Sequence, residues 1–149
     1  MIKLEVADAK SDAPLISTEF FVAGDSFDTE ACTRLFGMNP TEVWRQKRQE
    51  LVDRPDISNV AWLIRKSKRP LYSVDDAVNE VLDVVWPARQ AIRDFADQNA
   101  VDIGINCNVT IYEDRPVYEL SRQSINRLAQ IGCSFGLDIF DYSEGHEIS

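Results

Sequence analysis

The sequence predicts an α+β domain with a mixed or mostly antiparallel sheet of four to six strands, covered by helices on one face. Residues 73–99 have the pattern of a long amphipathic helix, which needs a sheet to pack on. Strand-like alternation lies on both sides of it, and a strand followed by a capped helix and a glycine occurs at residues 15–38 and again at 101–133. We therefore expect two βα-type halves around a long, kinked central helix.

Residues 15–24 predict the first strand, because β-branched and aromatic residues alternate there and place one face in the core. A short helix follows, with Asp28 at its N-cap and Gly37 in a left-handed position at its end. We expect Leu35 to lie in the buried stripe of this helix, together with Phe36.

The segment between the two halves is more polar. Residues 42–48 hold Trp44 among charged side chains and predict either an edge strand or a short exposed helix. Residues 49–58 are polar and predict a long mobile loop. Residues 59–67 alternate as a central strand does, and we expect this strand to emerge into a turn at residues 66–70.

The central helix has a clear start and a predicted interruption. Ser73 is placed as its N-cap, and Asp76 three residues later completes the pattern of a capping box. Pro87 has no N–H to donate, so the helix is expected to kink after Trp86 and to continue to about Asn99. The predicted buried stripe comprises Val74, Ala77, Val78, Val81, Leu82 and Val85.

The second half repeats the order of the first. Residues 101–112 alternate strictly and predict a second firm strand. Ser121 is placed as the N-cap of a further helix, with Ile125 in its buried stripe. Residues 137–142 predict a last strand, in which Ile139 faces the core.

Length and composition indicate a single domain over residues 1–149, with a weakly ordered start at 1–14 and a flexible tail at 143–149. A chain of this length buries roughly 70% of the surface that its unfolded form exposes, which is enough for an unaided core. No apolar run approaches the roughly 18 residues of a membrane span, and no secretory leader is evident. We therefore expect a cytoplasmic protein that does not associate with membranes.

The side chains that catalysis or metal binding needs are sparse. His146, the only histidine, lies in the polar tail, so no nucleophile–histidine–acid triad is available. Cys32, Cys107 and Cys133 lack the C-x-x-C spacing of metal or redox sites and lie in apolar patterns, which predicts buried, reduced thiols. The glycines do not form a phosphate-binding loop. The sequence therefore predicts neither an enzyme nor a cofactor or metal site.

The charge of the chain is uneven. The net charge of −9 opposes general affinity for nucleic acid or anionic membranes and favours a basic protein partner. Residues 43–70 carry a net charge of +5 and interrupt this acidic background. Because Trp44 and Trp62 lie among these cations, a nucleic-acid-binding domain using this segment is the alternative. A small-ligand-binding domain using the same segment is a further one.

Several motifs together resemble a family. They are F-F-V-A-G-D, F-G-M-N-P-T, A-W-L-I-R-K-S, R-L-A-Q-I-G-C and L-D-I-F-D-Y, in this order along the chain. Over roughly residues 19–142 the chain resembles a bacterial family of small α+β domains of unknown function. The resemblance implies a single domain and, for some members, a role as immunity proteins of polymorphic toxin or contact-dependent inhibition systems. Most of the matched positions are turns, caps and core residues, which identify a fold better than a function.

These observations give one functional hypothesis. The chain is expected to be a non-catalytic immunity protein that binds and neutralises a basic toxin domain, such as a nuclease, encoded next to it. Acidic side chains on a rigid helix suit such a partner, because little conformational freedom is lost on binding. The predicted partner-binding residues are Asp76, Glu80 and Asp83 on the central helix, Asp141 and Glu144 at the end of the last strand, and Trp44 as an aromatic anchor.

Overall fold

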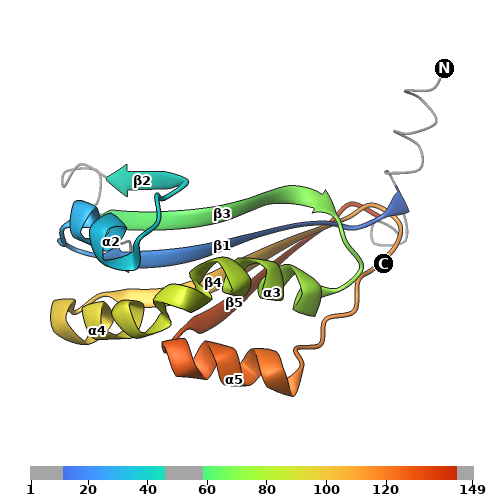
Figure 1. Ribbon diagram of the computed structural model, residues 1–149. Coiled ribbons are helices and arrows are strands. Elements are labelled where there is room, and N and C mark those ends of the chain that lie inside the picture. Colours follow the sequence, from blue (N-terminus) through green and yellow to red (C-terminus); the bar gives the residue numbers. More distant parts are fainter. Residues whose placement is uncertain (1–11, 46–58, 144–149) are drawn as a thin grey trace.

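The structure is a computed structural model that describes residues 12–45 and 59–143. The described chain forms an α+β domain in which helices lie on one face of a mixed, five-stranded sheet (Figure 1). The strands are β1 (Leu15–Gly24), β2 (Glu42–Arg45), β3 (Val60–Pro70), β4 (Asp102–Ile111) and β5 (Ser134–Asp141). The helices are α2 (Thr29–Phe36), α3 (Val74–Val85), the 3₁₀ turn η2 (Trp86–Ala88), α4 (Arg89–Asn99) and α5 (Arg122–Ile131). The predicted fold class is confirmed.

The sheet has the order β2-β3-β1-β4-β5, so β1 lies at its centre. β1 pairs antiparallel with both β3 and β4, and its predicted bounds are confirmed. Ile16, Thr18, Phe20 and Val22 are buried against the helices, as the alternation predicts. β5 joins β4 in parallel through α5, whereas β2 and β3 are antiparallel. The two halves therefore share an element order but not a strand pairing.

β3 is longer than the sequence indicates. The expected turn at residues 66–70 is wrong, because β3 continues to Pro70, which lies opposite Leu15 of β1. An irregularity between Ile16 and Thr18 shifts the register and lets the ladder continue past the polar residues. Pairing with a central strand thus outweighs the local turn signal.

Trp62 of β3 anchors the core. Its side chain is fully buried, and its indole N–H donates a hydrogen bond of 3.0 Å to Thr33 Oγ1 on α2. Phe20 and Phe36 pack edge-on against its ring. The aromatic centre therefore joins α2 to the sheet.

The central helix follows the prediction closely. Ser73 Oγ accepts a hydrogen bond from the backbone N–H of Asp76 at 3.1 Å. The entire predicted stripe of α3 is buried. At Pro87 the helix passes through η2 and continues as α4, which confirms the kink.

The other helix caps are also confirmed. Asp28 accepts from the N–H groups of Glu30 and Ala31, and Ser121 accepts from that of Ser124. Gly37 ends α2 with a φ of 69°, a left-handed conformation that favours glycine.

Three residues expected in the core are exposed. Leu35 and Ile125 are each 53% exposed, and Ile139 is 46% exposed. In α2 and α5 fewer residues are buried than the apolar pattern predicts, and Leu35 and Ile125 lie at the margins of the buried stripes. Ile139 faces the helix layer, but α5 packs mainly against α3 and α4 and does not cover it.

Residues 42–45 form the edge strand β2, so the edge strand and not the short exposed helix is the correct alternative for them. The predicted loop at residues 49–58, and most of the predicted loose start and tail, lie outside the described residues. No helix in the described part of the chain is long and apolar enough to span a membrane.

The three cysteines are free thiols. Cys32 and Cys107 are buried, and Cys133 is half-buried. Burial raises the pKa of Cys107 to about 11 and the pKa values of Cys32 and Cys133 to about 12. The thiolates that nucleophilic chemistry requires are therefore scarce at neutral pH.

Candidate interaction surface

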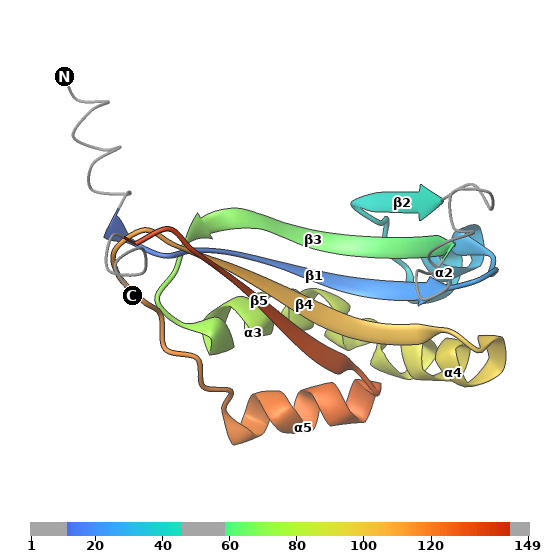
Figure 2. The same cartoon turned by 180° about the vertical axis from the view of Figure 1, so that it is seen from behind.

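The sheet face opposite α3 and α4 is not covered by any described helix, and we call it the open face (Figure 2). It carries the odd-numbered residues of β1 and the even-numbered residues of β4 and β5, because side chains alternate between the two faces of a sheet. Glu42 and Trp44 of β2 and Ala61, Leu63 and Arg65 of β3 lie on the same face by register.

Two ion pairs connect adjacent strands in the middle of the open face. Arg65 of β3 contacts Glu19 of β1, with NH2 and Oε2 3.1 Å apart, and Glu42 of β2, with NH1 and Oε1 3.0 Å apart. One guanidinium thus bridges three adjacent strands. Because the side chains of Arg65 and Glu42 are well exposed, we assign these pairs a modest role in stability and a clearer role in fixing the surface.

Trp44 lies at one end of this face. Its side chain is half-buried and lines a shallow hollow of about 480 Å³ together with Phe21, Ala23 and Leu63. The sequence-predicted anchor therefore lies on a surface that a partner is able to reach. Its role in binding stays a prediction.

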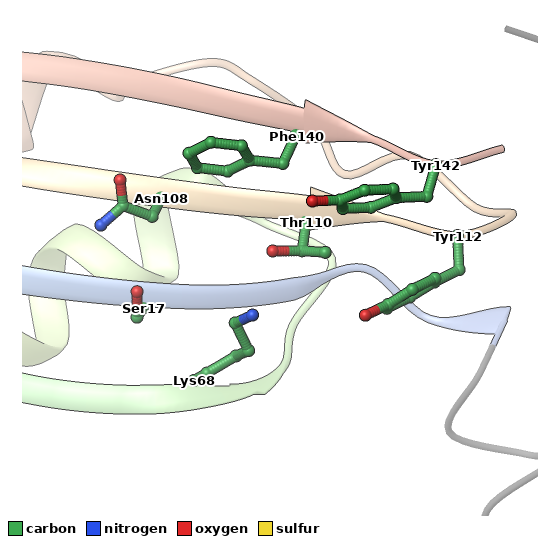
Figure 3. A pocket seen from close by; sticks show the side chains of 7 residues that line it. All are labelled: Ser17, Lys68, Asn108, Thr110, Tyr112, Phe140 and Tyr142. Carbon is green, nitrogen blue, oxygen red and sulfur yellow. The ribbon is translucent and has the colours of Figure 1, made fainter.

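The other end of the open face is aromatic (Figure 3). A hollow of about 560 Å³ is lined by Ser17, Lys68, Asn108, Thr110, Tyr112, Phe140 and Tyr142. The rings of Tyr112 and Tyr142 are stacked, with centroids 6.0 Å apart and an angle of 22° between their planes. Phe140 is 49% exposed and Tyr142 is 62% exposed. Large side chains in such a position resemble the anchors of protein interfaces.

The predicted acidic residues of α3 lie on the helix layer, on the opposite side of the sheet from the open face. Glu80 forms an ion pair with Arg69, and Asp83 Oδ1 lies 2.8 Å from Arg127 NH2. Asp76 is exposed and makes no ion pair within the described residues. Much of the charge expected on this helix face is thus already matched inside the protein.

Of the two acidic residues predicted at the end of the last strand, only Asp141 lies within the described residues. Asp141 Oδ2 lies 2.7 Å from Arg115 NH2, and Asp141 Oδ1 accepts from the backbone N–H and hydroxyl of Ser143. The Ser143 and Arg115 hydrogen bonds lower the pKa of Asp141 to about 2. Glu144 lies outside the described residues.

The basic segment at residues 43–70 is divided between several environments. Trp62 is in the core, so its ring is not available for stacking on a base. Arg65 and Arg69 are held by carboxylates, and Arg45 donates to Thr29 Oγ1 at 3.2 Å. Lys68 makes no ion pair within the described chain and extends into the aromatic hollow (Figure 3).

The described part of the chain contains no candidate metal centre. No group of three or more His, Cys, Asp or Glu side chains lies close enough there to hold a metal ion. His146 is outside the described residues.

The sequence reasoning did not select Tyr112, Phe140 or Tyr142 as functional residues. The only signal for them was position: they follow the alternation of β4 and β5 on the side opposite the apolar core face. This position indicates exposed residues only once the structure shows that no described helix covers this face of the sheet.

The comparisons with known proteins identify a family but no function. A family model described as "Domain of unknown function (DUF4279)" matches residues 14–142, which include all the strands and helices described above. No curated protein and no solved structure matches the chain.

Proposed function

The chain belongs to the family described as domain of unknown function DUF4279, and from this premise we propose that it is a non-catalytic immunity protein. Its partner is a basic toxin domain, such as a nuclease, encoded beside it. Binding covers the surface through which the toxin engages its substrate. This function places the chain in the cytoplasm, where an incoming toxin acts.

The observation that carries the proposal is the open face. Phe140 of β5, together with Tyr112 and Tyr142 directly after β4 and β5, exposes an aromatic ring, and Trp44 exposes part of another at the far end of the face. Aromatic side chains on rigid strands lose little conformational freedom when a partner covers them, so they favour tight binding. Exposed aromatic side chains at both ends of the face support binding of a protein.

Charge supports a basic partner. The chain carries a net charge of −9, and a nuclease that binds a polyanion presents a basic surface. Opposite net charges accelerate encounter and orient the two proteins before contact. The acidic side chains of this chain then take the place of the phosphates that the toxin would bind.

The test is a genetic and a binding experiment with the neighbouring genes. We expect an adjacent reading frame to encode a toxin domain whose expression stops growth, and co-expression of this chain to restore it. The purified pair should form a complex whose affinity decreases as the salt concentration rises. A neighbourhood without a toxin gene, or a toxin domain that this chain neither binds nor neutralises, would reject the proposal.

The aromatic hollow favours one second candidate. A cavity that combines stacked rings with the Lys68 ammonium suits an anionic ligand with a flat ring, or a single-stranded nucleic acid. Titration with a short single-stranded oligonucleotide and with mononucleotides decides this case. Saturable binding that Lys68→Ala weakens would support it over the immunity function, whereas no binding would remove it.

A further inference from the structure

β5 is an edge strand of the described sheet. It pairs in parallel with β4, and no described strand pairs with its other side. About half of the backbone N–H and C=O groups of an edge strand point away from its neighbour and are free to pair with another chain. Figure 2 shows β5 beside β4 on the side of the sheet nearest α5.

The two edges of the sheet differ in how they are protected. β2, at one edge, is four residues long and carries charged residues at both ends, Glu42 and Arg45. β5, at the other edge, is eight residues long and contains neither proline nor lysine, and its register with β4 is continuous. Short length, charge, proline and bulges are the usual means by which proteins block an edge. Of these means, β5 has only charge, in Asp138 and Asp141.

Apolar side chains flank the open edge on both sides of the sheet. Leu137 and Ile139 face the helix layer and are 37% and 46% exposed. Phe140, within the strand, and Tyr142, just after it, face the other way and are more exposed still. The side chains of a strand added to β5 would alternate between the two faces of the sheet. Such a strand would therefore cover the row of Leu137 and Ile139 on one face and the row of Phe140 and Tyr142 on the other.

The acidic charge of the chain favours a basic segment at this edge. Asp138 lies on the open face between these apolar residues, is exposed, and makes no ion pair within the described residues. A second copy of the chain would bring a further net charge of −9 to the same edge. A segment that alternates basic and apolar residues matches both rows: its cations meet Asp138 and the ring of Phe140, and its apolar side chains meet Leu137 and Ile139.

We infer that β5 is the docking strand of this protein, and that an extended segment of its basic partner pairs with β5 as a sixth strand of the sheet. The backbone hydrogen bonds of the added strand supply affinity, and the alternating side chains supply selectivity. The aromatic hollow lies beside this edge and receives side chains of the same segment. The inference rests on the proposed function, because it names the element through which the toxin domain is held.

The experiment uses the full-length chain and the purified toxin domain encoded next to it. Ile139→Lys places an ammonium among the apolar side chains of β5 that face the helix layer. Asp138→Lys reverses the exposed charge of β5 on the open face. Ile125→Lys is the control for the first, because Ile125 is equally exposed but lies on α5. Asp97→Lys, on α4, is the control for the second, because it changes the net charge by the same amount. Thermal unfolding of all four variants verifies that each is folded.

We expect Ile139→Lys and Asp138→Lys each to weaken binding about tenfold or more, and the controls to weaken it much less. Hydrogen exchange of the wild-type complex should show slowed amides in β5 and unchanged amides in α4. Sedimentation of the wild type alone should give a monomer.

The outcomes separate the two proposals. If the wild type binds the toxin domain, but the β5 amides exchange as before and both edge variants bind normally, the docking strand is rejected and the immunity function stands. If the wild type binds no neighbouring toxin domain, both are rejected. If the wild type is a dimer that Ile139→Lys dissociates, a second copy occupies the edge and the inference is overturned.

Discussion

Removing the Asp75 carboxylate should loosen the contact between α3 and α5. Asp75 Oδ1 accepts hydrogen bonds from the backbone N–H of Ser121 at 2.9 Å and from the hydroxyl of Ser124 at 2.6 Å. Ser124 is fully buried, so the carboxylate of one helix satisfies the first turn of another. A hydrogen bond to a charged group contributes about 1.5–3 kcal/mol, and Asp75 is partly exposed, so we expect Asp75→Ala to cost about 2 kcal/mol.

The assay is thermal and urea unfolding of Asp75→Ala beside the control Asp76→Ala. For a chain of this size, a loss of about 2 kcal/mol lowers Tm by about 4–8 °C. Asp76 is exposed and contributes its backbone N–H, not its carboxylate, to the cap, so its replacement should cost less than about 1 kcal/mol. Equal losses for the two variants would refute the role given to Asp75.

The same carboxylate gives a pH dependence with a defined sign. Burial raises the pKa of Asp75, but the hydrogen bonds from Ser124 and Ser121 outweigh it and leave that pKa below its ordinary value. A lowered pKa in the folded state means that the contribution to stability is complete above the ordinary carboxyl pKa and is lost as the pH falls through the folded one. The difference in stability between wild type and Asp75→Ala should therefore shrink below about pH 4. A difference that stays constant or grows in acid would contradict this mechanism.

Three further predictions concern the core, the thiols and the charge of α3. Leu82→Asp should abolish the cooperative unfolding transition seen by circular dichroism, because it buries an unpaired charge in the contact between helix and sheet. Cys107, whose pKa is raised to about 11 by burial, should react slowly with thiol reagents at neutral pH and quickly only in denaturant; fast labelling of the native chain would show that its place in β4 is wrong. Asp76→Lys should slow association with the proposed toxin domain modestly and leave dissociation unchanged, because Asp76 lies on α3 and not on β5. Glu80→Lys and Asp83→Lys should also lower Tm by breaking ion pairs. Faster dissociation of Asp76→Lys in stopped-flow measurements would indicate that the interface lies on α3.

The features predicted correctly from the sequence are those that depend on neighbours along the chain. The caps at Asp28, Ser73 and Ser121 and the break at Pro87 follow from local backbone chemistry, so the residue types alone indicate them. The stripe of α3 is unambiguous because its helix lies across the middle of the sheet, and no side chain of the stripe is left at a margin.

The features that were wrong depend on neighbours across the fold. The polar residues before Pro70 look like a turn, yet pairing with β1 keeps them in a strand. Leu35 and Ile125 continue apolar patterns beyond the width that the packed helices cover. Similarly, the carboxylates of Glu80 and Asp83 look free in the sequence, because their arginine partners lie on other elements.

β4 and β5 show why the surface that we propose for binding is difficult to recognise from the sequence. Both strands alternate, and in both the odd-numbered residues face the helix layer. In β4 these residues are buried, since strands lie on both sides of β4 and helices lie over it, whereas Ile139 of β5 is half exposed at the edge. A strand that only closed the sheet would be stable with polar side chains at its margin, and apolar ones there expose the edge to aggregation. The presence of Leu137, Ile139 and Phe140 at this edge therefore favours the proposed partner strand, which would cover them, over a role in the stability of the isolated domain.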